Sequence, residues 1–176
     1  VITRESMILA GQPWVNALFA QLDPTVEVTW LYAEGASVPA NAAFLELKGS
    51  ARSLLTGERA ALNFLQTLSA VATRVAGFVQ LLDGLPTRLL DTRKTTPGLR
   101  WPAKYAVQAG GGHNHRFGLD DAILIKDNHI AYAGGITVAV RSARAAVGHL
   151  VKIEVEVDTL EQLDELLTCD ADVVLL

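Results

Sequence analysis

The chain has 176 residues, half of them hydrophobic and 19% charged, which provides enough apolar material for a buried core and excludes an intrinsically disordered protein. Its formal net charge of −4 argues against nucleic acid or an anionic membrane as the main partner. With one cysteine, Cys169, no long apolar run and no N-terminal signal pattern, we expect a cytoplasmic protein without a membrane span.

The first half of the chain mixes strands with a helix. Residues 26–32 are rich in β-branched and aromatic side chains and predict a strand, and residues 43–47 alternate like a half-buried strand. From Arg59 to about Leu82 there is no proline, and apolar residues recur at helical spacing, which predicts one long amphipathic helix. The Asp-Gly-Leu-Pro sequence at 83–86 ends that helix.

After Pro86, short apolar strands alternate with helical segments. The expected order is a strand at 87–91, a helix at 104–109, a strand at 122–126, a helix at 138–147, a strand at 151–157, a helix at 160–167 and a strand at 172–176. This alternation predicts a parallel sheet with helical crossovers. Lys152, Glu154 and Glu156 share one face of their strand, which a doubly wound sheet would bury but the wet mouth of a barrel tolerates. We therefore expect an α/β barrel.

Basic residues gather in the stretch 88–126. It contains seven basic residues against three acidic ones, a net charge of +4, while the rest of the chain carries −8. A cationic stretch in an acidic protein predicts a pocket for a small, multiply anionic ligand. Within it, the loop 91–98 places Arg93 and Lys94 beside threonines, a pattern suited to clamping a carboxylate or phosphate. A solvated surface loop has the same composition and stays an alternative.

Three other features each allow two interpretations. Lys126 ends a predicted buried strand, so its ammonium needs an anionic ligand or a structural ion pair with Glu154 or Glu156. A metal site is less favoured, because no cysteine or helical histidine pair accompanies the candidate ligands, which are His113, His115 and His129. Arg59 stands at the predicted helix start, where its charge opposes the helix dipole. That conflict suggests a ligand, although a solvated arginine explains it too.

Four stretches together resemble one family closely, quinolinate phosphoribosyltransferase, also called nicotinate-nucleotide pyrophosphorylase (carboxylating). They are residues 57–73 (GERAALNFLQTLSAVAT), 89–100 (LLDTRKTTPGLR), 110–130 (GGGHNHRFGLDDAILIKDNHI) and 153–158 (IEVEVD). The resemblance covers essentially the whole chain and implies a type II phosphoribosyltransferase fold. Residues 1–66 would belong to an N-terminal α/β sandwich-like domain that ends within the long helix. Residues 67–176 would form the first part of an open, incomplete parallel α/β barrel.

The resemblance also implies a reaction and the residues that serve it. Such an enzyme transfers the phosphoribosyl group of phosphoribosyl pyrophosphate to quinolinate with decarboxylation, giving nicotinate mononucleotide, CO2 and pyrophosphate in NAD biosynthesis. The positions that match the family's quinolinate carboxylate site are Arg93, His115, Arg116 and Lys126, with Thr92 lining it. Lys94 matches a phosphoribosyl pyrophosphate ligand, and Glu156 lies on the ribose and metal side. Lys94, Lys126 and Glu156 are the catalytic candidates, and Mg2+ would accompany phosphoribosyl pyrophosphate.

Oligomeric state and completeness follow from the same resemblance. Arg59 matches an arginine that reaches into the neighbouring subunit's active site, so a homodimer is implied. The family pattern extends beyond both ends of this chain, and we therefore expect a fragment that is inactive by itself. Two alternatives stay open: a Schiff-base barrel lyase with Lys126 as its nucleophile, and an inactive truncated chain that acts as a dimerisation scaffold.

Overall fold

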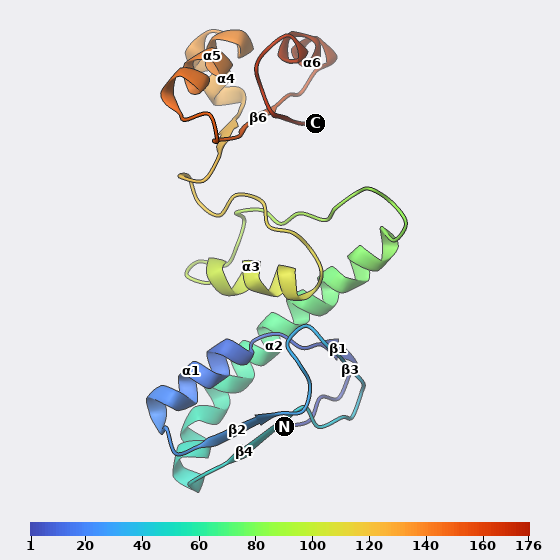
Figure 1. Ribbon diagram of the computed structural model, residues 1–176, viewed down its shortest axis with the longest axis vertical. Helices are drawn as coiled ribbons and strands as arrows, with labels where there is room; N and C mark the ends of the chain where they lie inside the picture. Colours follow the sequence, from blue (N-terminus) through green and yellow to red (C-terminus); the bar gives the residue numbers. More distant parts are fainter. The chain divides into compact units, whose positions relative to one another are not determined.

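Seven strands and six helices make up the regular structure of the chain, and a computed structural model describes all 176 residues (Figure 1). In chain order they are β1 (Met7–Ile8), α1 (Gln12–Leu22), β2 (Glu27–Trp30), β3 (Ser37–Val38), β4 (Leu45–Lys48), α2 (Ala51–Leu81), α3 (Arg100–Ala109), β5 (Ile123–Ile125), α4 (Asp127–Ala133), α5 (Ile136–Ala146), β6 (Ile153–Glu156), α6 (Leu160–Leu167) and β7 (Val173–Leu175). None of these helices combines the length and the apolar character that crossing a membrane requires.

The chain separates into two compact units by the contacts between its residues. Unit 1 comprises Val1–His115 and unit 2 comprises Arg116–Leu176. The expected boundary between residues 66 and 67 separates two domains of the family pattern and not two contact units. The contacts therefore do not test it, and it stays a prediction.

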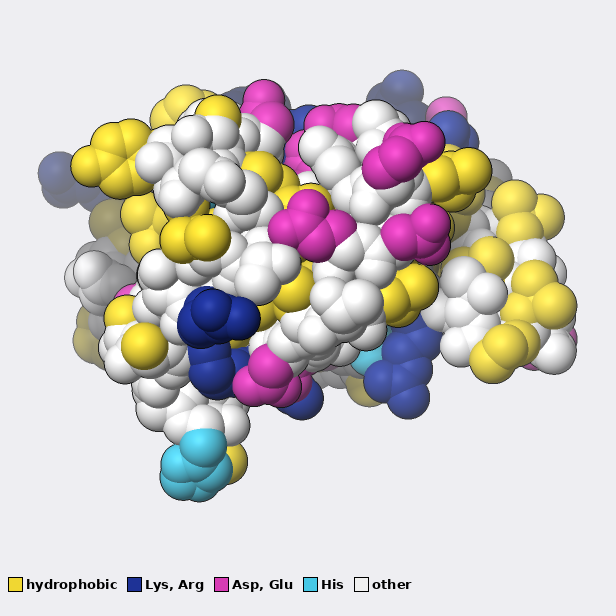
Figure 2. Space-filling model, turned by 90° about the horizontal axis from the view of Figure 1, so that it is seen from above, with side chains coloured by type: hydrophobic (Ala, Val, Ile, Leu, Met, Phe, Trp, Pro, Cys, Tyr) yellow, Lys and Arg dark blue, Asp and Glu magenta, His cyan; other side chains and the backbone are white.

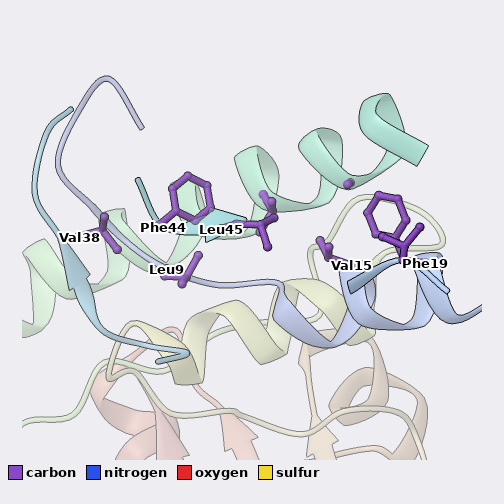
Figure 3. Packing of buried hydrophobic residues seen from close by; sticks show 9 residues of the cluster. Leu9, Val15, Phe19, Val38, Phe44 and Leu45 are labelled. Atoms are coloured by element: carbon purple, nitrogen blue, oxygen red, sulfur yellow. The ribbon is translucent and has the colours of Figure 1, made fainter. Parts of the chain in front are cut away.

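The N-terminal part of unit 1 is built from two small antiparallel sheets and two packed helices. Strand β1 pairs with β3, and β2 pairs with β4. The expected strands at 26–32 and 43–47 are thereby confirmed, as β2 and β4. Figure 3 shows Val15 and Phe19 of α1 turned toward α2, within a core that also contains Leu9, Val38 and Leu45. All five of these side chains are buried, so this cluster is the main apolar contribution to the stability of the region.

Helix α2 starts at Ala51, well before the predicted start near Arg59. The Ser50 side chain caps it by accepting a hydrogen bond from the N–H of Ser53 (3.1 Å). Gly57 marks a close approach between helices, because a Cβ there would lie 2.6 Å from Cε1 of Phe19. Arg59 consequently lies in the third turn of α2, beyond the reach of the helix dipole. The predicted conflict between Arg59 and the helix dipole was wrong.

Helix α3 packs against the C-terminal half of α2 and ends at three consecutive glycines. A Cβ on Gly110 would collide with the carbonyl oxygen of Ala72 in α2, and Gly111 has a φ of 85°. Both positions therefore require glycine. The N–H groups of Gly110, Gly111 and Gly112 all donate to carbonyl oxygens of α3. This glycine triplet is thus a helix end and a packing contact.

The expected strand at 87–91 was wrong. Instead, a single parallel bridge joins Leu90 to His113. Two hydrogen bonds hold it, from His113 N–H to the oxygen of Leu89 (2.9 Å) and from Asp91 N–H to the oxygen of His113 (3.1 Å). The backbone pairing goes no further, because side chains take over the next hydrogen-bonding positions, as described below.

Unit 2 contains a three-stranded parallel sheet in the order β5-β6-β7. Helices α4 and α5 connect β5 to β6, and α6 connects β6 to β7, so the predicted parallel sheet with helical crossovers is confirmed here. Helix α4 was not predicted. Ile153, Val155 and Val157 are buried, whereas Glu154 and Glu156 are only partly buried. The predicted alternation of charged and apolar faces along this strand is also confirmed.

Candidate active site

The predicted site residues are divided between the two units. Unit 1 contains Arg59, Thr92, Arg93, Lys94 and His115. Unit 2 contains Arg116, Lys126 and Glu156. The structure defines the surroundings of each group within its own unit.

In unit 2, Lys126 and Glu156 form an ion pair at the carboxyl ends of neighbouring strands. Ile125 of β5 is in register with Val155 of β6, so the next residues on each strand lie side by side. The Lys126 Nζ lies 2.5 Å from the Glu156 Oε2. Of the two acids considered for Lys126, the structure selects Glu156. The carboxyl end of a parallel sheet is also where α/β enzymes bind their ligands.

This pair stays accessible to solvent. The Lys126 side chain is 43% exposed and that of Glu156 is 31% exposed. An exposed ion pair contributes little to stability, on the order of 1 kcal/mol or less. Each partner can therefore exchange the other for a ligand group at small cost.

The backbone of Lys126 is fixed by the start of α4. Its N–H donates to Nδ1 of His129 (3.0 Å), which completes a capping box at the helix start. This use of His129 is incompatible with the same nitrogen binding a metal. No group of three His, Cys, Asp or Glu side chains in the chain has an arrangement that could hold a metal ion. The structure thus gives no support to the three-histidine site.

Arg116 begins unit 2 beside a tight turn. Its Nη1 donates a long hydrogen bond to the oxygen of Ala122 (3.5 Å). Burial opposes ionisation of the nearby Asp121, but N–H groups of Phe117 and Gly118, together with the Arg116 charge, hold the pKa of Asp121 below its usual value. Asp121 is therefore an anion that partly balances Arg116.

In unit 1, the loop after Asp91 presents Thr92, Arg93 and Lys94. Thr92 and Lys94 are exposed, and Oγ1 of Thr92 accepts a hydrogen bond from the N–H of Lys94 (3.1 Å). Arg93 is half-buried, and its Nε is shielded from solvent without a hydrogen-bond partner. An unsatisfied guanidinium N–H is costly by itself, and an anionic ligand would satisfy it.

A buried ion pair that the sequence did not reveal lies behind this loop. Lys104 of α3 is only 1% exposed, and its Nζ lies 2.5 Å from Oδ1 of Asp91. The same ammonium donates to the carbonyl oxygen of His115 (3.0 Å). Sequence reasoning missed Lys104 because lysines on helices are almost always exposed, and no local pattern marked this one as buried.

Arg59 lies well apart, along α2, from the point where the end of α3 packs. It is exposed on α2, whereas Gly110 packs against Ala72, farther along the same helix. At 1.5 Å of rise per residue these two points on α2 are about 20 Å apart.

One face of the molecule can be inspected for charge in the space-filling view of Figure 2. The face of the molecule drawn in Figure 2 carries acidic, basic and hydrophobic side chains intermingled, in keeping with the net charge of −4. An extended nucleic-acid surface, in contrast, is typically a continuous basic patch.

Two family models match the chain almost from end to end. The model described as quinolinate phosphoribosyl transferase, N-terminal domain, matches residues 1–69. The model described as quinolinate phosphoribosyl transferase, C-terminal domain, matches residues 71–176. The expected order of an N-terminal domain followed by a C-terminal α/β domain is thereby confirmed.

Curated relatives give the same result. The probable nicotinate-nucleotide pyrophosphorylase (carboxylating) of Bacillus subtilis is 46% identical over 175 residues, which cover 99% of this chain and 61% of that protein. The human nicotinate-nucleotide pyrophosphorylase (carboxylating) is 40% identical over 171 residues, covering 96% of this chain and 57% of that protein.

A solved structure, the nicotinate-nucleotide pyrophosphorylase from Francisella tularensis, superimposes with a TM-score of 0.95 at 51% identity. The match covers 98% of this chain and 61% of that one. The chain thus spans about three fifths of the length of these relatives.

Proposed function

Because the chain belongs to the quinolinate phosphoribosyl transferase family, we propose that this protein transfers the phosphoribosyl group of phosphoribosyl pyrophosphate to quinolinate. Its products would be nicotinate mononucleotide, CO2 and pyrophosphate. The observation that carries the proposal is the accessible Lys126–Glu156 pair at the carboxyl ends of β5 and β6. It offers one cation for a carboxylate and one anion for a ribosyl group that becomes positively charged.

Quinolinate is a small aromatic dianion, and we assign its two carboxylates to the cationic residues of the stretch 88–126. These are Arg93, His115, Arg116 and Lys126, with Thr92 as a neutral hydrogen-bonding group. The shielded, unpaired Nε of Arg93 supports this assignment, because a carboxylate would satisfy it. Arginine binds a carboxylate with two parallel hydrogen bonds, which also orients the ring.

Lys94 and Glu156 are assigned to the phosphoribosyl side. Lys94 is exposed and carries a point charge suited to a phosphate. Glu156 would stabilise the positive charge that develops on the anomeric carbon as pyrophosphate departs. When Lys126 turns to a quinolinate carboxylate, Glu156 loses its ion-pair partner and becomes available for the ribose.

The chemistry needs no nucleophile from the protein. The ring nitrogen of quinolinate forms the new bond to the anomeric carbon, and the bond from that carbon to pyrophosphate breaks. The ring is then cationic, so it accepts the electron pair left behind when the 2-carboxylate departs as CO2, and the ring carbon takes up a proton. The residues of this chain bind, orient and balance charge.

Mg2+ fits this arrangement as a companion of phosphoribosyl pyrophosphate. Magnesium is usually bound by one or two carboxylates together with substrate phosphates, and the accessible carboxylate of Glu156 is suited to that role. When bound, the ion would offset the negative charge of the departing pyrophosphate.

We also propose a homodimer in which Arg59 completes the partner's site, and a cytoplasmic location. The exposed position of Arg59 on α2, about 20 Å along the helix from where Gly110 packs, supports a role outside its own chain. The unpaired Cys169 is compatible with a reducing compartment.

The Schiff-base alternative is disfavoured by the contact that Lys126 makes. A Schiff base requires Nζ of Lys126 to be free to attack a carbonyl carbon, whereas this nitrogen lies 2.5 Å from the Glu156 carboxylate. Borohydride treatment with a carbonyl substrate would separate the two functions, and we expect Lys126 to stay unmodified. The non-catalytic scaffold would bind no quinolinate while still associating with itself.

The direct test is the reaction of the full-length protein. With phosphoribosyl pyrophosphate, Mg2+ and quinolinate labelled in its 2-carboxylate, we expect release of labelled CO2 and formation of nicotinate mononucleotide. Nicotinate offered in place of quinolinate is the matched control and should not react. Reaction of nicotinate without CO2 release from quinolinate would contradict the proposal.

A further inference from the structure

The Asp91–Lys104 pair in unit 1 has no part in the chemistry proposed above, yet it is the most deeply buried ion pair of the chain. The side chains of Lys104 and Asp91 are 2% and 8% exposed. Burying two charges costs several kcal/mol each unless excellent geometry and further hydrogen bonds compensate. A pair of this kind is weak evidence for stability, and a role in fixing local geometry is the better explanation for its presence.

The pair does make the further hydrogen bonds, and they converge on one peptide segment. Oδ1 of Asp91 accepts from the N–H of His115 (2.8 Å), and Nζ of Lys104 donates to the carbonyl oxygen of His115 (3.0 Å). The side-chain amide of Asn114, with its nitrogen turned toward the pair, donates to Oδ2 of Asp91 (2.8 Å) and to the carbonyl oxygen of Lys104 (3.0 Å). Both backbone polar groups of His115 are therefore held by the pair.

These hydrogen bonds replace the next step of a parallel ladder. The bridge between Leu90 and His113 uses the N–H of His113 and the N–H of Asp91. A regular continuation would join the N–H of His115 to the carbonyl of Asp91, and the carbonyl of His115 to the N–H of Arg93. Here the Asp91 carboxylate takes the first position and the Lys104 ammonium takes the second.

This substitution releases the chain after Asp91 from the ladder. Since Lys104 satisfies the His115 carbonyl, the N–H of Arg93 is not needed there, and residues 92–94 can turn away from the segment 113–115. The turn is completed locally, by the hydrogen bond from the N–H of Lys94 to Oγ1 of Thr92. The pair thus determines where the segments 92–94 and 113–115 separate, and it holds His115 in place.

From this geometry we infer that Asp91 and Lys104 are positioning residues that fix His115 relative to the Thr92–Lys94 loop. The inference rests on the proposed function, because the two segments hold residues assigned there to quinolinate. The pair itself does not touch the ligand. A displacement of about 1 Å between binding groups can lower activity about 100-fold, so removal of the pair should weaken ligand binding at the site.

The test uses the full-length protein with both charges removed together, as Asp91→Leu/Lys104→Met, so that no buried charge is left unpaired. The matched control is Glu27→Gln/Lys48→Met, which removes an exposed pair of the same unit with an N–O distance of 3.1 Å. Two quantities are measured: hydrogen exchange of the His115 amide, and the Kd for phthalate, an unreactive aromatic 1,2-dicarboxylate.

In the double variant we expect exchange of the His115 amide at least 100-fold faster and phthalate binding at least 10-fold weaker, with neither changed in the control. Faster exchange with a Kd within twofold of the unmodified protein would overturn the positioning role. Unchanged exchange would overturn the structural claim itself. If the unmodified protein binds no phthalate and releases no CO2, the proposed function fails, and the exchange result still decides the structural claim.

Should the double variant fail to fold, Lys104→Arg retains the buried charge but alters the donor that reaches His115. We expect the KM for quinolinate to rise at least 10-fold, and by clearly more than the KM for phosphoribosyl pyrophosphate, because His115 is assigned to quinolinate and only Lys94 of the loop to the other substrate. Equal rises in both constants, or no rise in either, would overturn the inference.

Discussion

Two lysine–carboxylate pairs with the same N–O distance of 2.5 Å have opposite surroundings in this protein. Lys104 and Asp91 are almost completely buried and hold backbone groups of His115. Lys126 and Glu156 are each about one third exposed or more and lie at the ends of two parallel strands. The buried pair cannot be exchanged for a ligand without exposing a charge to an apolar interior. The accessible pair can be, so contact distance alone does not distinguish a structural pair from a functional one.

Among the variants that test this comparison, Lys104→Met is expected to have the largest effect. The substitution leaves the Asp91 carboxylate buried without its partner, which should lower the free energy of unfolding by about 3–5 kcal/mol. Urea unfolding of the full-length protein measures it. Lys48→Met, which alters a side chain that is 81% exposed, is the control and should change stability by less than about 1 kcal/mol. A loss below about 1 kcal/mol for Lys104→Met would show that the two pairs do not differ as described.

Arg93→Ala extends the comparison to a cation without a carboxylate partner. Removal of one side of the proposed carboxylate clamp should cost about 2–4 kcal/mol of transition-state stabilisation, measured as the ratio of kcat/KM values for quinolinate. Arg88→Ala removes an exposed arginine of the same basic stretch and should leave kcat/KM within about twofold. If Arg93→Ala retained the original kcat/KM, Arg93 would be removed from the site.

Lys126→Met should affect function and spare stability, in contrast to the large loss of stability expected for Lys104→Met. Since the pair is accessible, the free energy of unfolding should fall by less than about 1 kcal/mol, while kcat/KM for quinolinate drops about 100-fold. Lys152→Met, at the opposite end of the same sheet, is the matched control for kcat/KM. Loss of stability in Lys126→Met comparable to that in Lys104→Met would mean that both pairs are structural.

The proposed shared site predicts complementation between two defective proteins. Arg59→Ala and Arg93→Ala are each expected to be nearly inactive. Mixing and reassociation would give hybrid dimers with one intact site, returning about a quarter of the full activity for random pairing. Each variant taken alone through the same procedure is the control. Absence of recovery in a mixture that demonstrably contains hybrid dimers would argue against a role for Arg59 in the partner's site.

The smallest expected effect concerns the ion pairs of Asp172 with Lys152 and Arg144, and it is an effect on the pH dependence of stability. Hydrogen bonds from Lys152, the Ile153 N–H and Arg144 hold the pKa of Asp172 well below its ordinary value of 3.8. Because the unfolded chain then binds the proton more readily, this contribution is complete above pH 3.8 and is lost as the pH falls further. Asp172→Asn should therefore reduce the acid dependence of unfolding between about pH 4 and pH 2. An unaltered acid profile would show that these contacts contribute nothing.

Local patterns predicted most of unit 2 and part of unit 1. Helix α6 and the strands β5, β6 and β7 agree with the expected positions because local patterns mark them: a helical period in α6, alternation in β6 and short apolar runs in β5 and β7. Helix α2 starts earlier than predicted, because Ser50 caps it at Ala51 and Gly57 lies inside the helix, against Phe19. That contact joins residues far apart in sequence, and no local pattern records it.

By itself the sequence determined the family, the class of fold, and which residues carry charge near predicted strand ends, because these properties follow from composition and from patterns along the chain. Only the tertiary structure decided that Lys126 pairs with Glu156, since strand register selects that partner. It alone also placed Lys104 in the interior, behind His115. The physical reason is that residue type specifies the charge of a side chain, whereas its exposure and its partner depend on segments that meet only after folding.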